Sequence, residues 1–181
     1  MLVLASQSPR RSEILRQAGL ECTVRIAAID EAVVAGETPE NYVQRLAVEK
    51  ASAIPAAETE VVLGADTTVV IDGEILGKPL DAADARRMLT LLSGRRHDVL
   101  TGICLRRGTQ IVRDVATTGV VFAPLSHQEI EDYVKSGEPM DKAGAYAIQG
   151  LACKFVERIE GDYFNVMGLP ISLVYRHLRA M

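Results

Sequence analysis

Apolar and polar residues alternate along this chain in blocks that predict strands and helices in turn. Residues 2–5 form a short apolar run typical of a buried strand, and residues 22–27 alternate apolar with polar as a half-exposed strand does. The run 60–76 predicts two strands around Asp72–Gly73, a dipeptide that favours a hairpin turn. The complete set of predicted strands is 2–5, 22–27, two within 60–76, 97–107, 110–123 and 152–159.

The helical period predicts the other elements. The clearest helix, 81–94, has an acidic start, an apolar stripe that includes Met88 and Leu92, and Gly94 at its end. The predicted helices are 9–18, 39–54, 81–94, 126–137 and 169–181. Residues 141–150 are small and apolar, which favours close backbone approach over a long helix.

Strands and helices follow one another irregularly, with several hairpins. This order predicts an α/β fold with a mixed, twisted central sheet flanked by helices rather than a strictly parallel sheet. The 181 residues, 48% of them hydrophobic and 24% charged, suffice for one well-cored domain, so we expect residues 1–181 to form a single domain.

Charge and cysteine usage narrow the classes of function. The net charge of −4 argues against a dedicated nucleic-acid binder. Three scattered cysteines without a CxxC pair argue against a zinc site and predict reduced thiols. The N-terminus is apolar before it is basic, unlike a signal peptide, and no apolar run nears the ~20 residues of a membrane span. We therefore expect a cytoplasmic protein without membrane or nucleic-acid partners.

Two arginines lie where a helix should begin. Ser8 is a good N-cap and Pro9 suits the first helical position, so Arg10 and Arg11 fall in the first turn. The helix dipole disfavours cations there. Either a ligand such as phosphate supplies the missing negative charge, or the arginines are solvated or paired with a carboxylate such as Glu13.

Asp66 interrupts an apolar strand. Its burial is costly unless the carboxylate is paired, hydrogen-bonded or metal-bound, and the alternative is a bulge at which it bonds its own backbone. Asp30 and Glu31 lie in a loop, where solvation is the default. One of them together with Asp66 could hold Mg²⁺, which needs only one or two carboxylates besides phosphates.

Lys50, Lys78 and Gln149 complete the candidates. Either lysine alone is more often a solvated surface group, and the segment around Lys78 lacks the spacing and the Ser/Thr of a Walker A loop. Gln149 has apolar neighbours, and a buried amide needs partners, for which the edge of a nucleobase is one candidate.

Taken together, several segments resemble the Maf family over nearly the entire chain. They are LASQSPRRSEIL (4–15), DE (30–31), LAVEKA (46–51), GADTTV (64–69), GEILGKP (73–79), LSG (92–94), DKAGAYAIQG (141–150) and GLP (168–170). The resemblance implies an inosine-triphosphatase-like (Maf/Ham1) architecture and hydrolysis of nucleoside triphosphates to monophosphate and pyrophosphate. It also implies a divalent metal (Mg²⁺ or Mn²⁺), a homodimer, and an association with inhibition of septum formation.

Arg10, Thr67 and Gln149 match the Maf subgroup that acts on dTTP, UTP and some modified pyrimidine nucleotides. The resemblance makes these three the selectivity residues and Asp66 the general base. It adds Ser8, Arg11, Lys50 and Lys78 as substrate-binding residues, with Glu31 and Asp66 as metal ligands.

Two other functions stay open on the sequence. One is a nucleotide-binding regulator of cell division that does not turn its ligand over. The other is a phospho-aspartyl phosphatase based on GADTT, which the absence of a second Asp two residues after Asp66 disfavours.

Overall fold

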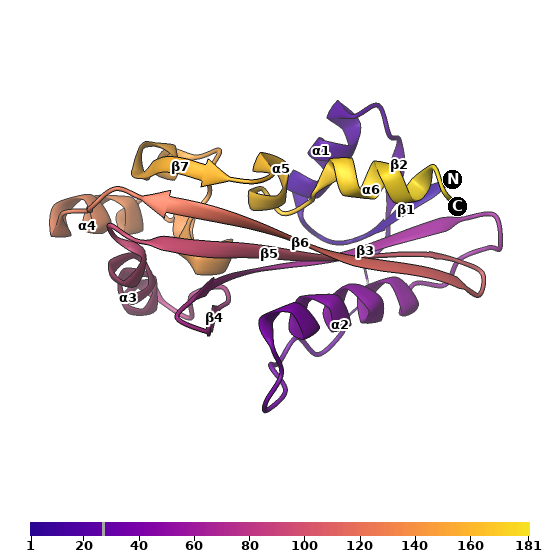
Figure 1. The fold of residues 1–181 in the computed structure, drawn as a ribbon, viewed down its shortest axis with the longest axis horizontal. Helices are drawn as coiled ribbons and strands as arrows, with labels where there is room; N and C mark the ends of the chain where they lie inside the picture. Colours follow the sequence, from indigo (N-terminus) through magenta and orange to yellow (C-terminus); the bar gives the residue numbers. More distant parts are fainter. Residues whose placement is uncertain (27) are drawn as a thin grey trace. The chain divides into compact units, whose positions relative to one another are not determined.

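A computed structural model describes residues 1–26 and 28–181, and its α/β fold confirms the predicted class (Figure 1). The strands are β1 Leu2–Ala5, β2 Cys22–Val24, β3 Val61–Ile71, β4 Glu74–Leu76, β5 Arg96–Arg107, β6 Gln110–Phe122 and β7 Val156–Glu160. They form a sheet of order β2-β1-β3-β5-β6-β7, with β4 paired to β3. The β1–β2 and β1–β3 pairs are parallel, whereas β3–β4 and β6–β7 are antiparallel, so the sheet is mixed as predicted.

The helices agree closely with the hydrophobic period. They are α1 Pro9–Gln17, α2 Pro39–Ser52, α3 Ala82–Leu92, α4 His127–Lys135, α5 Tyr163–Val166 and α6 Ile171–Leu178, with short 3-10 helices η1 Glu138–Asp141, η2 Ala143–Ala145 and η3 Leu151–Phe155. Helix α2 ends three residues before Pro55, because the residue preceding a proline avoids the helical region.

Several predicted boundaries were wrong. The strand predicted over 22–27 ends at Val24; the Arg25 side chain turns to a bidentate ion pair with Glu60, and Ala27 lies outside the described residues. The first half of the strand predicted over 152–159 is instead the 3-10 helix η3, closed by a bond from the Cys153 N–H to the Gly150 carbonyl.

The C-terminal segment also departs from the prediction. The helix expected over 169–181 spans only Ile171–Leu178 and begins after Pro170, which occupies its N-cap. Helix α5 was not predicted; it is a single turn stabilised by the Asp162 carboxylate, which accepts from the Phe164 N–H. Such a short helix has too few residues to show a hydrophobic period.

Residues fall into two compact units, and β3, β5 and β6 each contribute residues to both. The first unit comprises residues 1–67, 100–116 and 168–181, and the second comprises residues 68–99 and 117–167. Each unit contains a hydrophobic cluster of its own: Val3, Ala47 and Val62 belong to the first, and Leu89 and Phe122 to the second.

Two glycines let α2 lie directly on the strands of the first unit. A Cβ at Gly64 of β3 would come within 2.1 Å of the Ala47 carbonyl oxygen, and one at Gly102 of β5 within 2.3 Å of the Val43 carbonyl oxygen. In this unit α2 covers one face of the strands, and α1 and α6 lie on the other (Figure 1). This contact determines how far the side chains of α2 stand from β3.

The segment 141–150 makes the close approach that its small residues predict. Gly144 has φ +66°, and a Cβ there would lie 2.7 Å from the Val69 side chain. The Gly144 N–H donates to the Gly77 carbonyl at 3.1 Å. The Gly144 backbone therefore packs directly against the Val69 side chain of β3 and bonds to the loop after β4.

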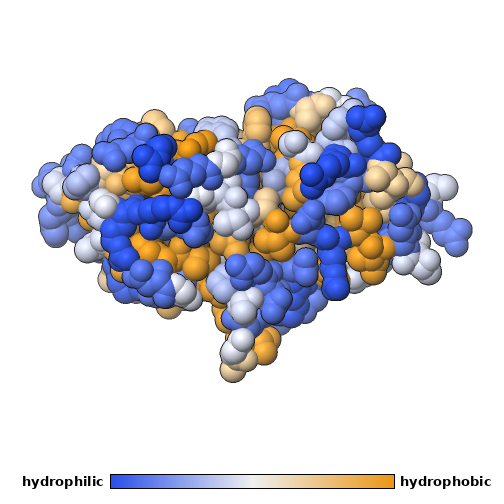
Figure 2. Space-filling view, in the orientation of Figure 1, coloured by the Kyte–Doolittle hydropathy of each residue, from blue (hydrophilic) through white to orange (hydrophobic). Residues whose placement is uncertain are grey.

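The surface mixes hydrophilic and apolar side chains. Figure 2 shows hydrophilic residues over much of the drawn face, with smaller apolar areas between them. Among the residues that the structure describes, no helix has the length and hydropathy needed to cross a membrane.

Candidate active site

The Lys50 ammonium group joins two carboxylates that are far apart in the sequence. Its Nζ lies 2.6 Å from Oδ1 of Asp66 and 2.7 Å from Oε1 of Glu31. Lys50 comes from the last turn of α2, Asp66 from the middle of β3, and Glu31 from the loop before α2. These three predicted site residues thus meet at one point.

Asp66 is buried, as expected for an acid within an apolar strand. Its carboxylate pairs with Lys50, so of the alternatives left open by the sequence the structure favours pairing over a bulge that bonds its own backbone. Burial raises the pKa of Asp66 above its ordinary value, while the charges of Lys50 and Arg11 act in the opposite direction. A carboxylate with a raised pKa is better suited to accept a proton near neutral pH than an exposed one.

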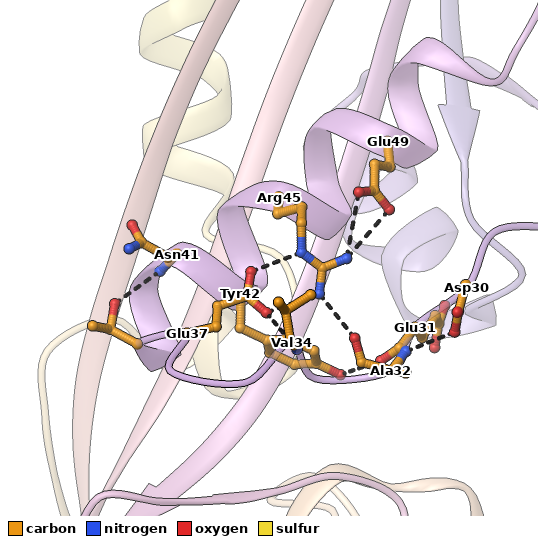
Figure 3. A network of polar contacts seen from close by, with 10 residues as sticks. Asp30, Glu31, Ala32, Val34, Glu37, Asn41, Tyr42, Arg45 and Glu49 are labelled. Carbon is orange, nitrogen blue, oxygen red and sulfur yellow. Dashed lines mark hydrogen bonds and ion pairs between the residues drawn. The ribbon is translucent and has the colours of Figure 1, made fainter.

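The loop that carries Glu31 is attached to α2 by an arginine (Figure 3). Arg45 donates to both carboxylate oxygens of Glu37, at 2.7 and 2.9 Å, and to the carbonyl of Ala32 at 2.9 Å. The other oxygen contacts of the guanidinium are with Glu49, one turn further along the helix. A bidentate pair of this kind holds geometry as well as charge.

Tyr42 holds the same loop at Glu31 itself. Its hydroxyl donates to the Glu31 carbonyl at 3.0 Å (Figure 3). Burial, together with the negative charges of Asp66 and Glu31, raises the pKa of Tyr42 to about 12, so the hydroxyl keeps its proton. Tyr42 precedes Lys50 by eight residues on the same helix, and this helical spacing is the sequence signal that the two side chains lie near one another.

Arg11 turns inward instead of remaining at the start of α1. It donates to the Gly168 carbonyl at 2.7 Å and to the hydroxyls of Ser6 and Thr67 at 3.0 Å each. Burial lowers the pKa of Arg11, and the nearby Asp66 carboxylate acts in the opposite direction. The guanidinium thus joins Ser6 directly after β1, Thr67 of β3 and Gly168 before α6, contacts that the sequence did not reveal.

The side chains of Asp66 and Thr67, adjacent on β3, lie on opposite faces of the sheet. Asp66 faces α2, whereas the Thr67 hydroxyl lies 2.9 Å from Thr101 Oγ1 and accepts from Arg11 of α1. This follows from the two-residue period of a strand. Although the two side chains lie on opposite faces, the Arg11 charge acts to lower the pKa of Asp66, against the effect of burial.

In the described part of the chain, no side chain caps the N-terminus of α1. Ser8 occupies the N-cap, as predicted, but its side chain makes no capping hydrogen bond. Glu13 pairs with Arg16 at 2.6 Å, and the Arg11 guanidinium donates to Ser6, Thr67 and Gly168. Arg10 is half-buried. A helix terminus with this arrangement suits an anion.

Lys78 and Gln149 belong to the second unit. Lys78 is exposed in the loop after β4. Gln149 is exposed too, so the expectation of a buried amide was wrong: its neighbours Ala147 and Ile148 are buried, and a tight turn points its side chain outward.

The donor set around Lys50 fits a hard divalent cation. Two carboxylates, Glu31 and Asp66, already converge on one positive charge, and Mg²⁺ needs no more than two when phosphates supply the rest. Among residues 1–26 and 28–181 no group of three or more His, Cys, Asp or Glu side chains forms a site made of protein ligands alone.

Comparison with known proteins now decides the family. The sequence model described as Maf-like protein matches residues 1–181. The chain belongs to the Maf family. This Maf protein is 52% identical over 179 residues to the dTTP/UTP pyrophosphatase of Koribacter versatilis, covering 98% of this chain and 93% of that one. It is 57% identical over 175 residues to the dTTP/UTP pyrophosphatase of Anaeromyxobacter dehalogenans, covering 94% and 89%.

Solved structures with the same fold include two Ham1 proteins. The Maf chain matches the Staphylococcus aureus Ham1 protein with a TM-score of 0.57 at 16% identity, covering 99% of this chain and 98% of that one. A HAM1 protein from Coxiella burnetii gives a TM-score of 0.56 at the same identity and coverage. The Maf/Ham1 architecture expected from the sequence is confirmed.

Proposed function

We propose that this protein is a nucleoside triphosphate pyrophosphatase that hydrolyses dTTP and UTP to the monophosphate and pyrophosphate. The observation that carries the proposal is the buried Asp66 carboxylate, joined through Lys50 to Glu31. Relatives that are more than half identical and are named dTTP/UTP pyrophosphatases support the choice of substrate.

Asp66 acts as the general base. Water attacks the α-phosphorus, its proton passes to the Asp66 carboxylate, and the bond from the α-phosphorus to the bridging oxygen breaks as pyrophosphate leaves. The Lys50 charge favours the ionised form of Asp66, because it opposes the effect of burial on the pKa. Glu31 and Asp66 would hold Mg²⁺ or Mn²⁺, which would neutralise charge on the phosphoryl oxygens.

Phosphate binding falls to the cationic residues. Arg10 and the open N-terminus of α1, with Ser8, offer charge and N–H groups to an anion, and Lys78 offers an exposed ammonium. Arg11, whose N–H groups already donate to three protein acceptors, acts by placing Thr67.

Gln149 selects the base. Its amide can donate to a pyrimidine carbonyl and accept from the ring N3–H, which a glutamate could not do in both directions. A site that relies on such hydrogen bonds discriminates strongly, because the wrong base leaves polar groups unpaired. Thr67 and Arg10 are the other predicted selectivity residues, and modified pyrimidine nucleotides are further candidate substrates.

Product analysis tests the proposal directly. Purified protein with Mg²⁺ or Mn²⁺ should convert dTTP and UTP to monophosphate and pyrophosphate in equal amounts, measured by ion-exchange chromatography. Chelation with EDTA should stop turnover, and added metal should restore it. Release of orthophosphate as the first product would refute the proposal, and tight nucleotide binding without turnover would favour a regulator instead.

The remaining proposals concern the whole chain. We expect residues 1–181 to act as one catalytic domain, since the family match spans them all. A cytoplasmic homodimer stays a prediction, and sedimentation equilibrium would test the assembly.

A further inference from the structure

Two residues that the proposed reaction does not use hold the turn that carries Gln149. The turn runs from Ala147 to Gly150 and is closed by a bond from the Gly150 N–H to the Ala147 carbonyl at 3.0 Å. Gln149 is its exposed residue. The two residues are Tyr133, buried on α4, and Glu138, at the start of η1.

Their hydrogen bonds form one continuous chain. The Ala147 N–H donates to the Tyr133 hydroxyl oxygen at 3.2 Å. The Tyr133 hydroxyl donates to Glu138 Oε1 at 2.8 Å, and Glu138 Oε2 accepts from the Leu151 N–H at 3.1 Å. The backbone is thus held two residues before Gln149 and two residues after it.

The protonation state of Tyr133 fits its role as the donor to Glu138. Burial and the hydrogen bond to Glu138 raise the pKa of Tyr133, so its hydroxyl keeps the proton that it donates. The two carboxylate oxygens of Glu138 accept from donors on different sides, the Tyr133 hydroxyl and the Leu151 N–H. Gly150 is also needed, since a Cβ there would lie 2.4 Å from Glu138 Oε1.

We propose that Tyr133 and Glu138 are positioning residues for base selectivity, because they fix the turn that presents the Gln149 amide. This inference rests on the proposed function. Thymine offers a carbonyl acceptor beside an N3–H donor, whereas cytosine offers an amino donor beside an N3 acceptor. A turn held at both ends keeps the amide matched to thymine; a loosened turn allows the amide to shift and match cytosine.

The test compares kcat/KM for dTTP with kcat/KM for dCTP. Tyr133→Phe should reduce the dTTP-to-dCTP ratio roughly tenfold, the effect of losing about one oriented hydrogen bond. Glu138→Gln should reduce it in the same direction, because an amide keeps only one acceptor oxygen. The ring contact of residue 133 with Phe155, at a centroid distance of 5.4 Å, survives in Tyr133→Phe and preserves folding.

The control is Tyr163→Phe, which deletes a hydroxyl from an exposed ring of the same unit and should leave the ratio unchanged. In a Gln149→Ala background, Tyr133→Phe should cause no further loss of selectivity. Amide hydrogen exchange over residues 147–151 should accelerate in Tyr133→Phe whether or not nucleotide is present.

An equal loss for both nucleotides, an additive effect on top of Gln149→Ala, or an unchanged exchange rate would overturn the inference. Failure of the proposed function can be told apart from failure of this inference, because the wild-type measurements by themselves reveal it. A wild type that does not hydrolyse dTTP, or does not prefer it to dCTP, refutes both proposals.

Discussion

Asp66 illustrates how one residue combines chemistry with a cost to stability. A carboxylate removed from water is unfavourable when charged, and a single lysine compensates only in part. Under the proposed mechanism this cost has a purpose, because only the ionised form can take a proton from water. Glu31, which is exposed, carries no comparable penalty.

Asp66→Asn should abolish most turnover while sparing the fold. Loss of a general base lowers kcat by on the order of 10²–10⁴-fold, measured as pyrophosphate release from dTTP under saturating Mg²⁺. Asp132→Asn, which removes an exposed carboxylate from α4, is the matched control and should keep wild-type activity. Full activity in Asp66→Asn would remove Asp66 as the base.

The pH dependence of stability follows from the direction of the Asp66 shift. Because the folded-state pKa is raised above 3.8, the folded protein retains the Asp66 proton to higher pH than the unfolded chain. The contribution is therefore favourable at low pH and is lost as pH rises through the folded-state pKa. Asp66→Asn at pH 7 should be at least as stable as wild type in urea unfolding, and a large loss of stability would contradict this.

At the scale of elements, α2 holds the proposed site residues Asp66 and Glu31 in place. One helix presents Lys50 to Asp66, Tyr42 to the Glu31 backbone and Arg45 to the preceding loop. Its distance from the strands is set by Gly64 and Gly102, where backbone meets backbone. We therefore expect substitutions at these glycines to displace Lys50 as well as to disturb packing.

Gly64→Ala should be strongly destabilising. The new methyl group would lie 2.1 Å from the Ala47 carbonyl oxygen. Because that oxygen belongs to the backbone, the clash can be relieved only if α2 moves. Overpacking of this kind costs about 3 kcal/mol or more, measurable as a lower urea midpoint, and the displaced Lys50 should lower kcat. Gly77→Ala is the matched control, because nothing lies within 4 Å of its added Cβ.

Arg45→Gln should loosen the loop that carries Glu31. Glu37 and the Ala32 carbonyl would lose their charged donor, while the Lys50–Asp66 pair would remain. We expect a higher Mg²⁺ concentration for half-maximal activity, by roughly tenfold, with a smaller change in KM for dTTP. The control Arg158→Gln removes a guanidinium paired with Glu160 in β7 of the other unit. An unchanged metal requirement would show that the loop does not position Glu31.

At the scale of the whole molecule, acid stability depends on a histidine in the core of the second unit. His97 is buried, packs edge-on against Phe122 and lies 2.9 Å from the Tyr146 hydroxyl. Burial lowers its pKa to about 4, so the folded protein resists protonation that the unfolded chain accepts near 6.5. The stability conferred by neutral His97 is complete above pH 6.5 and is lost as pH falls towards 4.

His97→Gln should flatten this part of the stability profile. Between pH 6.5 and 4 the free energy of unfolding of the wild type should fall by about 3 kcal/mol through this group. Urea unfolding at several pH values measures this change. The variant, although less stable at pH 7, should lose less over the same range. His127→Gln removes an exposed histidine and should keep the wild-type slope; an equal slope in His97→Gln would contradict the assignment.

Local pattern was enough to predict most of the helices and strands, because the period of apolar residues depends on neighbours within a few positions. It also singled out Asp66, since an acid inside an apolar run is costly wherever the strand packs. It failed at η3 and α5, where one turn of chain carries no period, and at Gln149, whose apolar neighbours are buried while its own side chain is not.

By itself, the sequence determined the fold class, the family resemblance and the residue types available for catalysis, because these are properties of order and composition. Tertiary structure alone decided that Lys50 joins Glu31 to Asp66, that Arg11 turns inward to Thr67 and Gly168, and that Tyr133 and Glu138 hold the Gln149 turn. Such contacts join residues of different elements, and the packing of α2 on two glycines, or of η1 beside the turn, sets their distances. No spacing along the chain encodes those distances.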